Sequence, residues 1–130
     1  MMDNKMICPE RFENVVEDGE TIGFAFLGRL PYYRGLGLSM IEDIAVSVDG
    51  EAVARADVRF EVRGRRYRLD EMESVFDDRW NFGEKARIIV LRPGGLAQGP
   101  HAIDFAVRMR VSYLPFVPTA KDRKELLLAA

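Results

Sequence analysis

Apolar and polar side chains alternate with a period of two along much of this chain. Because successive side chains of a β-strand point to opposite faces of the sheet, such alternation predicts strands with one buried and one solvent-exposed face. Shorter alternating runs lie at residues 22–26, 44–48 and 58–62. The clearest run has its apolar positions at Ile103, Phe105, Val107, Met109, Val111 and Tyr113.

Turn-forming residues separate these runs. Asp49-Gly50 follows an alternating run and predicts a type I′ hairpin, because both central residues of that turn need positive φ. Gly64 indicates a second hairpin in the same way. Pro93-Gly94-Gly95 and Gly99-Pro100 mark a longer connection before the run at 103–113, which we expect to be the last strand.

Two segments have a different pattern. Residues 85–91 are apolar at both odd and even positions, which predicts a strand covered on both faces, by its own core and by a loop or a partner protein.

In Asp70 to Asp78, Met72, Val75 and Phe76 are spaced three and four apart, which predicts one or two helical turns over a sheet edge. Asp70 and Glu73 resemble a capping box.

Roughly six to eight short strands with frequent turns predict an all-β fold, an antiparallel β-sandwich of jelly-roll type with one short helical segment. A small closed barrel is the alternative. No linker divides the chain, so we expect residues 1–130 to form a single domain. Residues 118–130 change in character, and their Leu126 to Leu128 run indicates a tail that docks on this domain or on a partner.

Composition narrows the function. The chain has 130 residues, 48% of them hydrophobic and 31% charged, which is typical of a globular domain rather than a disordered one. A net charge of -2 gives no field that would recruit nucleic acid or an acidic membrane. No apolar run approaches the about 20 residues of a membrane helix, and the N-terminus has no signal-peptide core. We therefore expect a cytoplasmic protein.

Residues that commonly carry catalysis are scarce. The only histidine is His101, which we expect to be an exposed turn residue, and the only cysteine is Cys8, which we expect to act as a small hydrophobe. Nucleophilic catalysis needs a base beside the nucleophile, and a zinc site needs several His or Cys ligands. With one histidine and one cysteine, we expect neither in this chain. A cluster of arginines is interpreted as a solvated hairpin or a salt-bridged subunit contact rather than an RNA patch. Its members are Arg63, Arg65, Arg66 and Arg68.

Two loops are unusually rich in aromatic and apolar residues. One extends from Leu30 to Met40 and contains Tyr32, Tyr33 and Arg34, while proline and glycine interrupt any regular strand or helix. The other extends from Asp77 to Gly83 and contains the only tryptophan, Trp80. Tyrosine, tryptophan and arginine commonly anchor interfaces, so these loops are candidates for partner contact; core packing is the competing interpretation of Trp80.

The same two loops carry a family resemblance. The chain resembles the β subunits of bacterial C-glycoside deglycosidases over nearly its whole length and in collinear order. The matching segments are LPYYRG (30–35), LSMIEDI (38–44), VSVDGE (46–51), LDEME (69–73), DDRW (77–80), FG (82–83), PGGL (93–96) and SYLPF (112–116). Gly37 departs from the pattern, because a bulkier or stiffer residue is expected there.

The resemblance implies a two-subunit enzyme. Its α subunit would be a (β/α)8 barrel similar to sugar isomerases, holding a divalent metal, expected to be manganese, and the catalytic base. The substrate would be a C-glycoside in its 3-oxo form, cleaved by elimination. No catalytic residue and no cofactor are expected in this chain. Its candidates for a partner interface or substrate wall are Tyr32, Tyr33, Arg34, Trp80, Asp78 and Arg79.

Two other functions compete with this one. A stand-alone carbohydrate-binding module of the sandwich type would use an aromatic platform from Tyr32, Tyr33 and Trp80. A self-contained hydrolase would need paired carboxylates facing one another across a cleft. Its candidates are Glu71, Glu73, Asp77 and Asp78.

Overall fold

The computed structural model describes residues 6–30, 35–81, 83–110 and 119–128. They form eleven strands and three short 3-10 helices. The strands are β1 (Ile7–Glu17), β2 (Glu20–Arg29), β3 (Leu36–Gly37), β4 (Ile41–Val48), β5 (Glu51–Ala52), β6 (Val58–Val62), β7 (Arg65–Arg68), β8 (Arg79–Trp80), β9 (Lys85–Leu91), β10 (Gly99–Met109) and β11 (Thr119–Leu128). The 3-10 helices are η2 (Leu38–Met40), η3 (Arg55–Asp57) and η4 (Leu69–Ser74).

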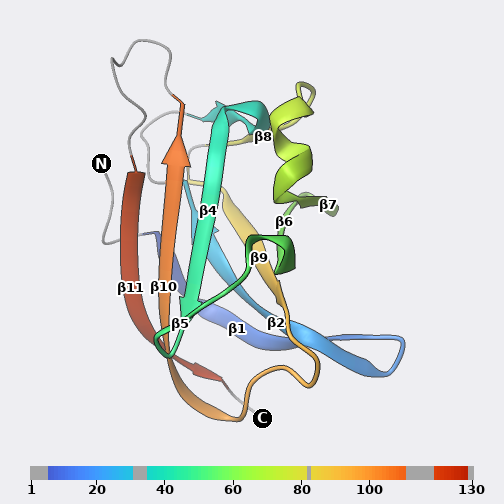
Figure 1. The fold of residues 1–130 in the computed structure, drawn as a ribbon, viewed down its shortest axis with the longest axis vertical. Helices are drawn as coiled ribbons and strands as arrows, with labels where there is room; N and C mark the ends of the chain where they lie inside the picture. Colours follow the sequence, from blue (N-terminus) through green and yellow to red (C-terminus); the bar gives the residue numbers. More distant parts are fainter. Residues whose placement is uncertain (1–5, 31–34, 82, 111–118, 129–130) are drawn as a thin grey trace.

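The strands form two antiparallel sheets that face each other as layers (Figure 1). One sheet has five strands in the order β1-β2-β9-β6-β7, and the other has four in the order β11-β10-β4-β5. A separate two-stranded ladder joins β3 to β8 at one end of the sandwich. Within the described residues no ladder joins the two layers, so the prediction of an all-β sandwich is confirmed and the closed barrel is not formed.

The inward faces of the strands make the core that their alternation predicts. Ile44, Val46 and Val48 on β4 are buried, as are the apolar positions of β6 and β10 from Val58 to Val62 and from Ile103 to Met109. Phe26 and Phe105 meet across the two layers, with ring centroids 5.3 Å apart in an edge-on arrangement. These contacts fix the register of both sheets, because a slip of one residue would turn every apolar face toward water.

Strand β9 is buried on both faces within its own chain. Ile88 and Val90 point into the core, whereas Ile89 belongs to a second cluster with Val15 and Ala25 on the outer face of the five-stranded sheet. Ile89 has no exposed surface. The expectation that a loop or a partner covers this strand is therefore wrong, since neighbouring strands of the same sheet supply the cover.

The hairpin turns follow the predicted chemistry. Asp49 and Gly50 both have positive φ, at 50° and 84°, and join β4 to β5. Arg63 and Gly64 join β6 to β7 with φ of 49° and 79°. Both predictions are confirmed, and an Asp-Gly turn at residues 18 and 19 makes a third such hairpin between β1 and β2.

The predicted helical segment is shorter and starts earlier than expected. It is the 3-10 helix η4, which ends at Ser74, and Glu71 Oε1 accepts a 2.8 Å hydrogen bond from the backbone N–H of Arg68 at its start. Met72 is buried, but Phe76 lies beyond the helix with 82% of its surface exposed. The predicted apolar face is thus confirmed for Met72 and for Val75, which packs against the core, but is wrong for Phe76. The predicted capping pair of Asp70 with Glu73 is also wrong, because Arg68 and Glu71 form the capping box.

The C-terminal segment forms strand β11 at the edge of the four-stranded sheet. It pairs with β10 along its whole length, so the run at 103–113 is not the last strand. Leu126 and Leu128 are buried in the core, whereas Leu127 points to solvent. Two of the three leucines of this segment are therefore covered by this domain.

Strand β11 also closes one open side of the sandwich. Two of its charged side chains point toward β1, the edge strand of the other sheet. Asp122 Oδ2 accepts a 2.9 Å hydrogen bond from Ile7 N, and Lys124 Nζ donates a 2.7 Å hydrogen bond to Ile7 O. The backbone N–H and C=O of Ile7 are thereby satisfied without a further strand, which opposes edge-to-edge pairing at this point of β1.

Candidate functional site

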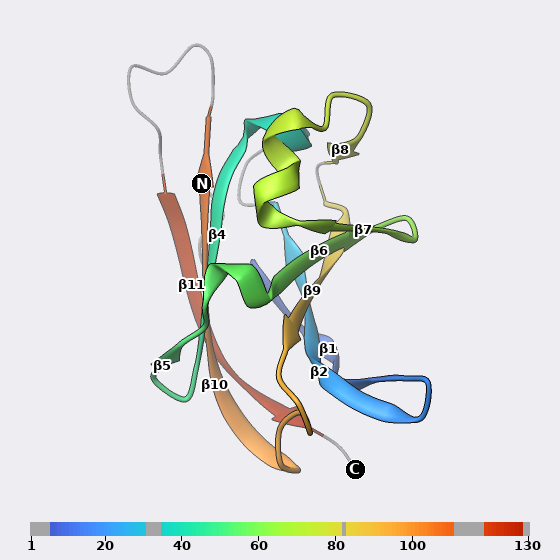
Figure 2. The same ribbon diagram turned by 45° about the vertical axis from the view of Figure 1, so that its right-hand side comes forward.

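The two loops that stand out in the sequence meet at one end of the sandwich. Leu36 pairs with Trp80 and Gly37 pairs with Arg79 in the β3–β8 ladder, and Leu38 N donates to Asp78 O over 3.1 Å. We call residues 35–38 together with 76–81 the β3–β8 corner. It lies beside η4 at the end of the molecule away from the C-terminus (Figure 2). The candidates Tyr32, Tyr33 and Arg34 lie outside the described residues.

Asp78 is almost fully buried, with 6% of its surface exposed. Its carboxylate accepts hydrogen bonds from the Arg63 guanidinium, from Tyr67 Oη over 2.7 Å and from Arg79 N over 2.9 Å. Burial alone would raise the pKa of Asp78, but these three hydrogen bonds outweigh it and hold the pKa below its usual value. Asp78 is therefore an ionised anchor, not a proton donor.

Arg63 connects this anchor to a second carboxylate. Its guanidinium also contacts both carboxylate oxygens of Glu84 and donates to Arg79 O over 2.7 Å. Glu84 Oε1 in turn accepts from Asn81 N and Asn81 Nδ2, at 3.1 and 3.2 Å. The β6–β7 hairpin thus fixes the turn that carries β8.

Trp80 is an interior residue. Its ring has no exposed surface and packs edge-on against Phe60, with centroids 5.0 Å apart, and its Nε1 donates to Glu84 O over 2.9 Å. This matches the core-packing interpretation. A ring with no exposed surface offers no platform to a sugar or a partner, so Trp80 supports the corner from inside.

The exposed part of the β3–β8 corner consists of Phe76, Asp77, Arg79 and Asn81. Arg79 Nη2 donates to Gly35 O over 3.0 Å and ties the two segments together. Asp77 has 80% of its side chain exposed, and Phe76 is one of three large apolar side chains that the described residues leave exposed. The helical spacing of the sequence places Phe76 on an apolar face, so it does not predict that this side chain is exposed. The two aspartates that follow Phe76 are the signal of a turn that could have indicated its exposure.

All four arginines of the predicted cluster form ion pairs within the chain. Arg63 pairs with Asp78 and Glu84, and Arg66 pairs with Glu17 and Glu61. Arg65 and Arg68 contact carboxylates at residues 77, 78, 70 and 71. The cluster forms a hairpin whose arginines pair within the chain, and Arg63 is the member that reaches the site; a subunit contact by the cluster stays a prediction.

His101 is not the exposed turn residue that we expect from the sequence. It lies in β10 with 12% of its side chain exposed. Its Nε2 is 2.7 Å from Ala97 O and its Nδ1 is 2.6 Å from Asp49 Oδ2. Because two acceptors face the two ring nitrogens, the doubly protonated ring fits best, and these contacts with Ala97 and Asp49 raise the pKa of His101.

The described residues show no cluster suited to a metal. No group of three or more histidine, cysteine, aspartate or glutamate side chains within them is placed to hold an ion. Cys8 is buried, and burial raises the pKa of its thiol. In the same part of the chain, no helix is long and apolar enough to cross a membrane.

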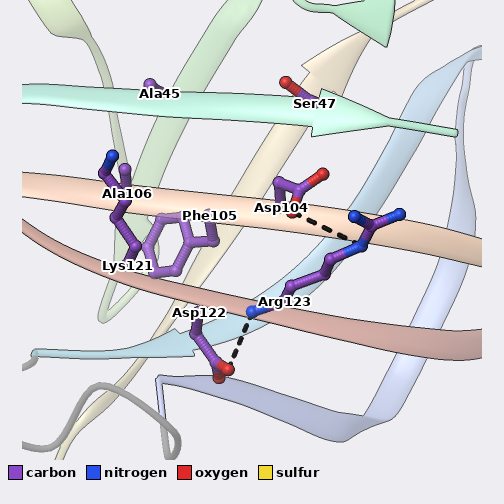
Figure 3. Close-up of a pocket in the computed structure, with 8 residues that line it drawn as sticks. All are labelled: Ala45, Ser47, Asp104, Phe105, Ala106, Lys121, Asp122 and Arg123. Atoms are coloured by element: carbon purple, nitrogen blue, oxygen red, sulfur yellow. Dashed lines mark hydrogen bonds and ion pairs between the residues drawn. The ribbon is translucent and has the colours of Figure 1, made fainter. Parts of the chain in front are cut away.

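The outer face of the four-stranded sheet carries an open hollow of about 320 Å³ (Figure 3). Small side chains of β4 and β10, namely Ala45, Ser47 and Ala106, form its floor. Asp104 and Arg123 form an ion pair of 3.6 Å across its margin. The charges here neutralise each other, and the hollow presents no nucleophile or base.

Comparison with known proteins identifies the family. Residues 2–113 match the family model described as C-glycoside deglycosidase beta subunit. The C-glycoside deglycosidase beta subunit of Eubacterium cellulosolvens is 35% identical over 115 residues, covering 88% of this chain and 78% of that protein. The 3'-dehydrocarminate deglycosidase beta subunit of a Microbacterium species is 39% identical over 94 residues, covering 72% of this chain and 70% of its own length.

A third relative, the C-glycoside deglycosidase beta subunit of Arthrobacter globiformis, is 32% identical over 68 residues, or 52% of each chain. The matched region includes both segments of the β3–β8 corner, since it extends from residue 2 to residue 113. The sandwich and the corner that it supports therefore belong to a member of the C-glycoside deglycosidase beta subunit family.

Proposed function

We propose that this chain is the non-catalytic subunit of a C-glycoside deglycosidase, and that its larger partner carries the metal and the catalytic base. The observation that carries this proposal is the match, over most of the chain, to proteins that are named as beta subunits. We further propose that the partner is a (β/α)8 barrel with a divalent metal, manganese, and that the complex works in the cytoplasm.

The reaction that we propose for the complex is an elimination. A carbon–carbon glycosidic bond has no oxygen that an acid could protonate, so ordinary glycoside hydrolysis has no leaving group. A ketone at C3 of the sugar would acidify the C2 proton, which a base of the partner would remove, and a metal held by the partner would supply stabilisation of negative charge at the sugar oxygens. The electron pair of that C2–H bond would then form the C1–C2 double bond while the bond to the aglycone breaks and the aglycone carbon takes up a proton.

One relative supports the oxidation state of this substrate. It is named for 3'-dehydrocarminate, a name that specifies a dehydro form. The overall change would be that of a carbon–carbon lyase, and a separate oxidoreductase would supply the ketone.

We assign the partner contact to the β3–β8 corner. Its turn is fixed by the buried Asp78 and by Trp80, while Phe76 and Arg79 remain at the surface. Preorganisation favours binding, because a side chain held on a rigid turn loses little freedom on association. The exposed ring of Phe76 is the kind of aromatic anchor that dominates many interfaces. Residues 32–34 directly precede Gly35 in the chain and are proposed to extend this contact.

The test compares two exposed apolar residues in the co-expressed complex. Phe76→Ser should weaken association with the larger subunit by about tenfold or more, since a central aromatic anchor contributes roughly 2 kcal/mol. Leu127→Ser, at a site 71% exposed on β11, is the matched control and should leave association unchanged.

Two results would oppose the proposal. Equal association for both variants would remove the β3–β8 corner from the interface. Cleavage of a 3-oxo C-glucoside by the purified chain alone would show that the small subunit is itself catalytic.

A further inference from the structure

A small basic pocket lies beside the edge strand β1, where Lys124 of the other sheet reaches it. We call it the Arg29 pocket. Its volume is about 120 Å³, the space of about four water molecules in the liquid. It can therefore hold a small polar group but not a sugar ring with its aglycone. Its lining residues are Ile7, Cys8, Pro9, Glu10, Arg29 and Lys124.

A bulge in β1 creates this pocket. The β1–β2 ladder pairs Cys8 with Leu27 and then Glu13 with Ala25, so β1 contains extra residues between the two pairs. Arg11, within the bulge, has a positive φ of 59°. The preceding Pro9 has no backbone N–H to give to the ladder. Bulges commonly re-aim side chains next to functional sites.

The guanidinium of Arg29 has a hydrogen-bond donor without an acceptor. Its Nε is buried, and it is the only such side-chain atom without a hydrogen-bond partner in the described part of the chain. No described carboxylate lies within ion-pair distance of Arg29, although its backbone N–H donates to Met6 O. A buried donor without an acceptor is costly, although the Arg29 side chain as a whole is only partly buried. An anion in the pocket would remove that cost.

The charges around the pocket define the class of anion. Lys85 lies directly opposite Arg29 in the β2–β9 ladder and pairs with Glu10. Lys124 Nζ lies 3.6 Å from Asp122 Oδ2 and donates to the backbone of β1. Both lysines thus have a carboxylate neighbour, and of these three cations Arg29 is the one for which the described residues place no carboxylate within ion-pair distance, although Glu10 is near enough to feel its charge. One unmatched guanidinium suits a monoanion.

We propose that the Arg29 pocket binds a carboxylate group. A guanidinium presents a planar fork of N–H donors that matches the two oxygens of a carboxylate, which a lysine ammonium cannot do. Two sources supply this chemistry, a small carboxylic acid in solution or an aspartate or glutamate of the larger subunit. The pocket does not depend on the assignment of the β3–β8 corner as the partner contact.

The first arm of the test uses acetate and the purified chain. Acetate at about ten times its Kd should raise Tm by roughly 5 °C, whereas chloride at the same ionic strength should not. In an ¹⁵N-labelled sample the Nε–H resonance of Arg29 should shift with the same saturation curve. Arg29→Gln should abolish both responses, and Arg108→Gln, an exposed arginine on β10, should keep them.

The second arm uses the co-expressed complex and separates the two sources. If the carboxylate belongs to the larger subunit, Arg29→Gln weakens association about tenfold, Arg108→Gln does not, and acetate competes with association. If it comes from solution, association is the same for both variants and only the first arm responds.

Two outcomes would overturn the proposal. One is the absence of any response to Arg29→Gln or acetate in both arms. The other concerns Asp3, the only acidic residue before Met6 in the sequence. If acetate acts on an Asp3→Asn variant but not on the wild type, the pocket is filled by this chain's own carboxylate, and no external ligand is required.

Discussion

Replacing Asp78 with asparagine tests the network that holds the β3–β8 corner. The amide has nearly the same size as the carboxylate, so the substitution removes the charge without opening a cavity. The Arg63 guanidinium then loses one of its two anionic acceptors and keeps Glu84, and one of the two side-chain oxygens of residue 78 becomes an NH₂ group beside the donors Tyr67 Oη and Arg63. We therefore expect a loss of stability and a looser turn at β8.

The structure sets the size of this loss. Breaking a fully buried ion pair costs roughly 3–5 kcal/mol. Arg63 has 42% of its side chain exposed, so water can take the place of the lost carboxylate and the cost must be lower. One hydrogen bond to a charged group contributes roughly 1.5–3 kcal/mol, so we expect Asp78→Asn to cost about 2–3 kcal/mol. For a chain of this length that is a fall in Tm of roughly 8–12 °C.

The effect must depend on pH in a defined direction. The folded state holds the pKa of Asp78 below its ordinary value, so its carboxylate stabilises the fold wherever the unfolded carboxylate is also ionised. This contribution is fully present above the unfolded pKa of about 3.9 and is lost as the pH falls through the lower, folded pKa. The difference between wild type and variant should be constant near pH 7 and shrink at strongly acidic pH.

Urea and thermal unfolding at pH 7 and pH 3 measure these quantities. Asp77→Asn is the matched control, because Asp77 is the adjacent aspartate, is 80% exposed and lies 4.0 Å from its arginine. It should leave Tm unchanged. If Asp78→Asn and Asp77→Asn melt within about 1 °C of each other at pH 7, the buried carboxylate does not hold the turn and the reasoning fails.

Three further predictions concern the rest of the sandwich. Hydrogen bonds to Ala97 O and to Asp49 raise the folded pKa of His101, so His101→Gln should lose most stability relative to wild type below about pH 6.5, and the gap should close as the pH rises through the raised pKa; an unchanging gap in urea titrations from pH 5.5 to 8.5 would contradict the charged ring. Gly37→Ala should stabilise by about 0.4–1 kcal/mol, because φ is -61° and a Cβ would meet nothing closer than 3.9 Å. Gly23→Ala should destabilise by at least about 2 kcal/mol, because its Cβ would lie 1.9 Å from Val90 O; equal melting temperatures for the two alanine variants would refute this contrast.

The strands that the sequence reveals are those with one face in the core. Strands β4, β6 and β10 alternate cleanly, because each buries every second side chain and leaves the others in water. The alternation of apolar and polar residues does not predict the edge strands β1 and β11, for a physical reason. A bulge interrupts the period of β1, and β11 points Asp122 and Lys124 inward, where their partner is a backbone rather than an apolar core.

The site is predictable only in part. The glycines and aromatic residues of the segments at 30–40 and 77–83 mark them as unusual, and the structure pairs the described parts of both in one ladder. The residues that hold the second segment come from a hairpin more than ten positions away in the sequence. Nothing in the local pattern connects Arg63 and Tyr67 to Asp78, because an ion pair has no sequence period.

Trp80 shows that polar neighbours in the sequence do not by themselves indicate an exposed side chain. Its neighbours Asp78 and Asn81 suggest a surface turn, yet their polar atoms are satisfied by Arg63 and Glu84, which leaves the indole free to enter the core. The aromatic side chain that does reach the surface is Phe76, four residues earlier and outside that network. In a turn of this kind the network of hydrogen bonds decides which aromatic ring is buried, and the ring outside the network is the one that a partner can contact.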